Sequence, residues 1–254
     1  MIPIKRGHEI DKMRRAGEAA ATVLSRLVGM IAPGVTTGEI DHAAGQFMAE
    51  LGVTSAFLGY KKFPGQICIS VNEEVVHGIG GRRKILYGDI VKLDVGIVRD
   101  GWIGDNATSV PVGIVDADVE RLLTVTEQIL QGAVDLVAPG RRLGDVCAHV
   151  EEQAVKHGFS VVREFVGHGV GRSLHEEPQI PNFGKRGTGP VLKPGMTLAI
   201  EPMINMGKPK VRVLEDKWTV VTADGLPSAH FEHTVLVTDE AAEILTWPRK
   251  TLLK

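Results

Sequence analysis

Five residues in the latter part of the chain have side chains that commonly bind metal ions: Asp94, Asp105, His168, Glu201 and Glu232. Four carboxylates and one imidazole form an oxygen-rich ligand set, which suits Mn(II), Fe(II) or Co(II) better than a structural zinc. Four acids gathered in one pocket would repel each other strongly unless cations lay between them. The set therefore predicts a site for two divalent ions.

The first two acids are expected on a pair of neighbouring strands. Asp94 ends the strand-like run 90–95, and Asp105 follows a turn at 100–102. A hairpin over this segment would bring both carboxylates to the same place.

The other three residues also stand in segments that look buried. Glu201 ends the apolar run 196–200, and Glu232 lies in the apolar segment 231–237. Acids embedded in apolar strands are rarely buried without a partner or a metal. His168 stands between two glycines, and we expect these to let the backbone approach an ion closely. The remaining histidines, His230 among them, are interpreted as ordinary core or surface residues.

An internal repeat organises the elements that must position these residues. The segment Ile31-Ala32-Pro33-Gly34 recurs as Val137-Ala138-Pro139-Gly140, and the runs 88–94 and 195–201 resemble each other at nearly the same offset. Asp94 and Glu201 thus occupy equivalent places. The repeat predicts an α+β fold with pseudo-twofold symmetry, built from two αα-then-β units at about 9–105 and 116–212. Their strands would form one curved antiparallel sheet with the helices on its outer face.

Helical patterns precede and follow each copy of the repeated segment. The first helix carries an apolar face from Ile10 to Leu27, and its counterpart is opened by Asp116. Thr36 and Glu39 have the spacing of a capping box before the next helix. Because no linker-like stretch separates the halves, we expect residues 1–254 to form a single catalytic domain.

Composition restricts the function classes. The 254 residues are 43% hydrophobic with a net charge of -2, which allows a sizeable core and gives no general nucleic-acid footprint. Two cysteines in unlike contexts imply no disulfide framework, so a reducing cytoplasm is expected. Neither a signal-peptide core nor a membrane-spanning stretch is found.

Other hydrolytic and nucleotide chemistries lack their motifs. The chain has no Gly-x-Ser-x-Gly elbow and no zincin motif. The segment 167–171 has neither the full dinucleotide fingerprint nor a phosphate-binding lysine. Cys68, in an apolar strand, is interpreted as a packed thiol rather than a nucleophile.

The five residues and three further motifs together resemble one known family. The motifs are Val76-His77-Gly78-Ile79, Gly167-His168-Gly169-Val170-Gly171-Arg172 and His175-Glu176-Glu177-Pro178. In order and spacing they are similar to those of the bacterial type I methionine aminopeptidases, from about Ile4 to Trp247. The resemblance implies the pita-bread fold. It also implies metal-dependent removal of N-terminal methionine from nascent proteins and peptides with a small second residue, by attack of a metal-bridging hydroxide.

The resemblance also implies roles for single residues. Asp105 and Glu232 would bridge two ions of cobalt, manganese or iron. Asp94 would complete one coordination shell, and His168 with Glu201 would complete the other. Glu201 could in addition shuttle a proton. His77 would contact the scissile amide and His175 the developing oxyanion.

By the same resemblance, the substrate's methionine side chain would lie against aromatic and sulfur groups, namely Phe57, Tyr60, Phe63, Cys68 and Trp218, with His77 and His175 beside them. Three residues depart from the pattern: Lys61 stands where some members have His, Phe57 where some have Cys, and Gly80 replaces a Pro. The first two affect the shape of the pocket.

Three alternative functions stay open. One is an X-Pro aminopeptidase or prolidase of the same fold, although such relatives usually carry an additional N-terminal domain. A second is a non-catalytic binding protein of that fold, and a third is a metal-binding structural or interaction domain. For the favoured function, the expected partners are nascent polypeptides with N-terminal methionine and transient contact with the ribosome. A monomer without membrane or specific nucleic-acid binding is expected.

Overall fold

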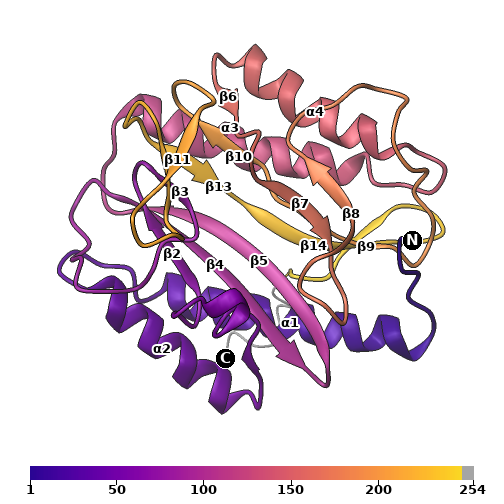
Figure 1. Ribbon diagram of the computed structural model, residues 1–254, viewed down its shortest axis with the longest axis horizontal. Helices are drawn as coiled ribbons and strands as arrows, with labels where there is room; N and C mark the ends of the chain where they lie inside the picture. Colours follow the sequence, from indigo (N-terminus) through magenta and orange to yellow (C-terminus); the bar gives the residue numbers. More distant parts are fainter. Residues whose placement is uncertain (248–254) are drawn as a thin grey trace.

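The computed structural model describes residues 1–247 and arranges them around one curved antiparallel sheet (Figure 1). The predicted domain 1–254 extends to residues 248–254, which lie outside this range. The sheet has the order β1-β4-β5-β14-β9-β7-β8, with β2 paired to β4 and β15 to β14. These strands are β1 (Thr54–Ser55), β2 (Cys68–Val71), β4 (Ile90–Arg99), β5 (Trp102–Pro111), β7 (Val166–Gly169), β8 (Glu176–Pro181), β9 (Thr197–Ile200), β14 (Glu232–Val237) and β15 (Ala242–Ile244).

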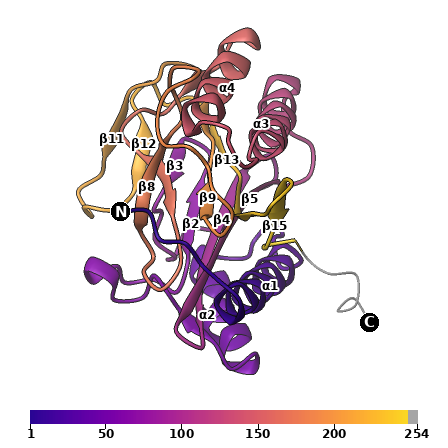
Figure 2. The same ribbon diagram turned by 90° about the vertical axis from the view of Figure 1, so that its right-hand side faces the viewer.

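Four helices pack on one side of this sheet (Figure 2), at the places that the repeat predicts. They are α1 (His8–Val28), α2 (Thr37–Glu50), α3 (Ala117–Asp135) and α4 (Leu143–Lys156). The contact between α1 and β5 is very close, because a Cβ on Gly104 would collide with the backbone carbonyl of Ala16. No helix within residues 1–247 combines the length and apolar character that a membrane span needs.

The start of α2 confirms the predicted capping box. The backbone N–H of Glu39 donates to Thr36 Oγ1 at 3.2 Å, and the backbone N–H of Thr36 donates to Glu39 Oε2 at 2.7 Å. The helix α3 also begins where predicted, after Asp116, although the Asp116 side chain makes no capping hydrogen bond. Its buried face includes Leu122 and Ile129 and packs into the second half of the core.

Two small three-stranded sheets, which the sequence did not predict, complete the β structure. One has the order β13-β10-β6 and the other β11-β12-β3. Their strands are β3 (Glu74–Val76), β6 (Ser160–Val161), β10 (Met203–Asn205), β11 (Val211–Val213), β12 (Val220–Thr222) and β13 (Ser228–His230). Four of these strands lie between β9 and β14 in the chain, so β14 falls outside the second repeat unit, 116–212. A short 3-10 helix, η1 (Tyr60–Lys62), lies between β1 and β2.

The main sheet has an approximate twofold arrangement. The strands β5 and β14 pair at its centre, and β4 and β9 flank them. The two flanking strands are those that the sequence repeat equates.

Candidate active site

The strand register places three of the predicted acids on one face of the sheet. Asp94 on β4 and Glu232 on β14 both pair with Ala107 of the intervening strand β5. Asp105 is two residues before Ala107, opposite Gly96. Since alternate residues of a strand point to the same face, the three carboxylates share a surface.

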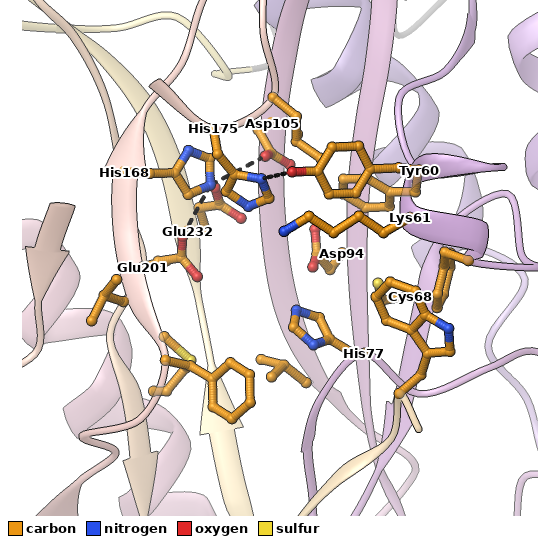
Figure 3. Close-up of a pocket in the computed structure, with 18 of the residues that line it drawn as sticks. Tyr60, Lys61, Cys68, His77, Asp94, Asp105, His168, His175, Glu201 and Glu232 are labelled. Carbon is orange, nitrogen blue, oxygen red and sulfur yellow. Dashed lines mark hydrogen bonds and ion pairs between the residues drawn. The ribbon is translucent and has the colours of Figure 1, made fainter. Parts of the chain in front are cut away.

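The remaining two residues join this group from the strands on the far side of β14. Glu201 follows β9 directly and lies next to Glu232, because Ile200 pairs with His233. His168 on β7 pairs with Ala199 of β9. All five side chains therefore converge at the centre of the sheet (Figure 3).

The local structure differs from the expectation at one point. Asp94 lies in the middle of β4 rather than at its end, since the strand continues to Arg99. The glycines around His168 also have a role within the sheet. A Cβ on Gly167 would lie 2.5 Å from the carbonyl oxygen of Ala199, and one on Gly169 would collide with the carbonyl of Glu177. These glycines are needed for close strand pairing.

Three of the residues are close enough to share an ion. One ligand atom from each of Asp105, His168 and Glu232 lies within 4.8 Å of the others. The Nε2 atom of His168 is 3.8 Å from Asp105 Oδ2 and 3.4 Å from Glu201 Oε1. On the other side of the ring, Nδ1 lies 2.9 Å from the carbonyl oxygen of Gly169. If Nδ1 carries the proton and donates to this carbonyl, the lone pair of Nε2 faces the acids.

The electrostatics of the cluster fit a cation site. Burial raises the pKa of Asp94 to about 7. Burial and the charges of neighbouring carboxylates raise the pKa values of Asp105, Glu201 and Glu232 well above their usual range. Within residues 1–247, the buried atoms Asp105 Oδ1 and Glu232 Oε1 have no hydrogen-bond partner. Orphaned carboxylate oxygens among mutually repelling acids are the arrangement that divalent cations stabilise.

The cluster forms one wall of a pocket of about 280 Å³. All twelve site residues predicted from the sequence line it: Phe57, Tyr60, Phe63, Cys68, His77, Asp94, Asp105, His168, His175, Glu201, Trp218 and Glu232. Further lining residues that the motifs did not indicate are Glu164, Phe165, Val166, Leu174 and Met203. Most of these are apolar, and nothing in their sequence context distinguishes them from ordinary core residues.

Two histidines stand at the pocket beside the acids. His77 has the unusual backbone angle φ of 61°, which is strained for a residue with a side chain. Burial lowers its pKa to about 4. His175 has Nδ1 2.8 Å from the Tyr60 hydroxyl, and its ring centroid is 4.3 Å from that of His168. Burial lowers the pKa of His175, and the nearby ammonium of Lys61 adds to this effect (Figure 3).

The other end of the pocket is aromatic. The rings of Phe63 and Trp218 meet edge to face with their centroids 5.1 Å apart. Phe57 lies directly over Gly96, where a Cβ would collide with its ring. Cys68 is buried and pairs with Asp94, and burial raises the pKa of its thiol well above the usual value. The thiol is therefore a packing group, as expected from the sequence.

Two buried polar side chains near the cluster were not singled out from the sequence. Lys92 is 1% exposed, and its Nζ donates to the carbonyls of Asn72 at 2.7 Å and Ser228 at 2.9 Å. His230 is also 1% exposed, and its Nε2 is 3.7 Å from Glu201 Oε2. Neither residue belongs to a motif, so only the three-dimensional structure shows their positions.

Comparisons with known proteins agree with this geometry. The model of metallopeptidase family M24 matches residues 11–239. Methionine aminopeptidase 1 of Bacillus subtilis is 47% identical over 246 residues, which cover 97% of this chain and 99% of the relative. The chain belongs to the methionine aminopeptidases of metallopeptidase family M24. The crystal structure of the methionine aminopeptidase from Thermotoga maritima has a TM-score of 0.95 and 48% identity, covering 97% of this chain and 99% of that one.

This family membership confirms the fold expected from the sequence, the pita-bread fold of the methionine aminopeptidases. A prolidase from Pyrococcus horikoshii shares the fold with a TM-score of 0.78, but at 20% identity the likeness shows the fold alone. The matched region covers 98% of this chain and 65% of the prolidase.

Proposed function

We propose that this chain removes N-terminal methionine from peptides and nascent proteins whose second residue is small. The observation that supports this most strongly is the cluster of four acids and His168, which forms one wall of the pocket and keeps two orphaned carboxylate oxygens. An aromatic surface at the other end of the same pocket offers a place for a flexible thioether side chain.

Two divalent ions would be held by the predicted ligands. In this proposal Asp105 and Glu232 would be shared by both ions, Asp94 would complete one shell, and His168 and Glu201 would complete the other. The oxygen-rich set favours Co, Mn or Fe. When bound, such ions supply Lewis acidity and lower the pKa of water from its bulk value to about 7.

The chain's own residues then bind the substrate and move protons. His77 would contact the scissile amide from its place on the pocket wall. If the Tyr60 hydroxyl donates to Nδ1 of His175, Nε2 of the same ring carries the proton and can donate to the developing oxyanion. Glu201 would in addition take up and return a proton during turnover.

The methionine side chain would lie against the aromatic end of the pocket. We assign it to the surface formed by Phe57, Phe63, Cys68 and Trp218, with Tyr60 at the border to His175. Phe57 and Lys61, which depart from the family pattern, both line this pocket and would set its shape.

Partners, compartment and domain organisation belong to the same proposal and rest on the family resemblance. We infer a monomer with a single catalytic domain that acts in the cytoplasm on nascent polypeptides, with transient contact to the ribosome. No specific nucleic acid or membrane is needed for this function.

One assay separates this function from its alternatives. The purified chain is incubated with Met-Ala-Ser and with Ala-Pro-Phe, with and without a chelator, and released amino acids are measured. We expect release of methionine only, its loss with chelator, and its recovery with Co(II), Mn(II) or Fe(II). Release of alanine from Ala-Pro-Phe would indicate an X-Pro aminopeptidase. If neither peptide is cleaved, the protein is non-catalytic. Met-Leu-Ser is the control for a large second residue and should be cleaved far more slowly.

A further inference from the structure

His230 is fixed in the core directly behind the acid cluster. It ends β13, and its backbone both donates a hydrogen bond to β5 and accepts one from it. Its N–H donates to Ser109 Oγ at 3.0 Å, and the Ser109 hydroxyl donates to the carbonyl of His230 at 2.7 Å. On the other side it pairs with Met203 of β10. The backbone of His230 is therefore fixed by contacts to both sheets.

The His230 side chain lacks a partner that its burial requires. In the part of the chain that the structure describes, its Nε2 atom makes no hydrogen bond. The nearest acidic atom is Glu201 Oε2 at 3.7 Å. Buried polar atoms are nearly always hydrogen-bonded, so an orphan that faces a carboxylate at this distance calls for an explanation.

The two oxygens of Glu201 face two different histidines. Oε1 is 3.4 Å from His168 Nε2, on the side of the proposed metal ligands. Oε2 faces His230, which does not line the pocket. The Gly169 carbonyl orients His168 through Nδ1, the ring nitrogen that points away from the acids. His230 lies in a similar position relative to Glu201, on the side of the carboxylate away from His168.

We propose that His230 is a positioning residue for Glu201. Once ions are bound, its Nε2–H would close the present 3.7 Å gap and donate to Glu201 Oε2, which would leave Oε1 directed toward the ions. This inference rests on the proposed function, because it takes Glu201 as a metal ligand. Residues that hydrogen-bond to metal ligands fix the orientation of those ligands and tune the affinity of the site.

The chemistry of the site explains why His230 is not itself a ligand. A ligand would have to reach the pocket side of the carboxylates, and His230 faces the oxygen on the opposite side. Holding Oε2 also restricts rotation of the carboxylate about its last bond. A preorganised Glu201 would bind its ion without having to be ordered first.

The test is metal binding to the metal-free protein, measured by titration calorimetry with Mn(II) and with Co(II). His230→Leu removes the donor at similar size, and His230→Gln keeps an N–H at a similar reach. We expect His230→Leu to weaken the affinity for one ion by about 10–100-fold. His230→Gln should restore binding to within about threefold of the unmodified chain, a difference too small to reflect a lost ligand contact.

His149→Leu is the matched control, since His149 Nε2 is also a buried orphan but belongs to α4 and lies against Gly132 of α3. It should leave both affinities unchanged. If His230→Leu does not fold, as judged by circular dichroism, His230→Asn takes its place, because its shorter amide cannot reach Glu201. It should show the same weakening.

Three results would overturn the inference: unmodified affinity in His230→Leu, an equal loss in His230→Gln and His230→Leu, or an equal loss in His149→Leu. Glu201→Gln, titrated in parallel, separates this failure from failure of the proposed function. If Glu201→Gln binds both ions as tightly as the unmodified chain, the ligand assignment itself is wrong. If Glu201→Gln binds weakly and His230→Leu binds normally, only the role of His230 is refuted.

Discussion

At the scale of single residues, the acid cluster is unfavourable until cations are added. Asp105 and Glu232 are almost fully buried, at 3% and 2% exposed, and each keeps one oxygen without a hydrogen bond among residues 1–247. A protonated pair would be stable but could not hold a divalent ion. Cation binding therefore requires both carboxyl groups to lose their protons, although burial favours the protonated form.

The bridging assignment leads to a first prediction. Asp105→Asn or Glu232→Gln should abolish methionine release, because a bridging amide cannot supply a charged oxygen to both ions. Activity on Met-Ala-Ser at saturating Co(II) and metal content by atomic absorption are the measurements. Asp100→Asn, in the exposed turn between β4 and β5, is the control and should behave like the unmodified chain. Full activity in either bridging variant would refute the assignment.

A second prediction concerns His175. His175→Ala should lower kcat by about a hundredfold or more while metal content persists, as for a lost oxyanion donor. Tyr60→Phe should lower kcat by a smaller factor, because it removes the hydroxyl that contacts His175 Nδ1 at 2.8 Å but keeps the imidazole. Steady-state kinetics on Met-Ala-Ser and metal analysis decide this. Loss of metal in His175→Ala would instead make His175 a metal ligand.

At the scale of elements, the sequence predicted best what local chemistry controls. The turn between β4 and β5 consists of Asp100 and Gly101, with φ angles of 52° and 76°, which suits a tight two-residue hairpin. The hairpin and the capping box of α2 are both visible in the sequence because each depends on a few neighbouring residues. The acids embedded in apolar strands were visible because such burial is costly.

What could not be predicted depends on contacts between distant segments. In the sequence Lys92 looks like an ordinary strand residue. Only in the folded chain does its ammonium donate to the carbonyls of Asn72 and Ser228. His230 likewise faces Glu201 only because β13 packs behind the main sheet. The strands β10 to β13 are three residues long each, too short for a pattern of alternating burial to identify them.

The contact between β4 and Phe57 provides a prediction at this scale. Gly96→Ala should displace the Phe57 ring, because the added Cβ would occupy the same space. We expect KM for Met-Ala-Ser to rise about tenfold, with unchanged metal content, since overpacking costs about 1–3 kcal/mol. Gly81→Ala is the control, because its Cβ would meet only the carbonyl oxygen of Ile79, at 4.0 Å. An unchanged KM in Gly96→Ala would remove Phe57 from the substrate pocket.

At the scale of the whole molecule, the metal site joins the two halves. Asp94 and Asp105 come from the β4–β5 hairpin, whereas His168, Glu201 and Glu232 come from strands of the second half. The central pair β5–β14 is the boundary between them. Repulsion among the acids therefore acts across this boundary, and bound cations would hold the halves together.

This arrangement predicts that the stability of the metal-free and metal-loaded proteins depends differently on pH. In the unfolded chain these acids ionise near their usual pKa values, about 4. In the folded metal-free chain, burial raises the pKa of Asp94 to about 7 and those of Asp105, Glu201 and Glu232 well above the usual range. The folded state thus binds more protons than the unfolded state above pH 4. Proton binding therefore stabilises the folded metal-free chain. This stabilisation is lost as the pH rises from about 4 through the raised pKa values of the folded state.

The measurement is the urea midpoint at pH 5 and pH 7.5, in EDTA and with saturating Mn(II). We expect the midpoint in EDTA to fall between the two pH values and the midpoint with Mn(II) to hold or rise, since deprotonated acids bind the ions. The control is the metal-free double variant Asp105→Asn/Glu232→Gln, in which two of the shifted groups are gone and the fall should be smaller. An equal fall in the double variant and the unmodified chain would show that groups elsewhere cause the pH dependence, and that the acid cluster does not strain the junction of the two halves.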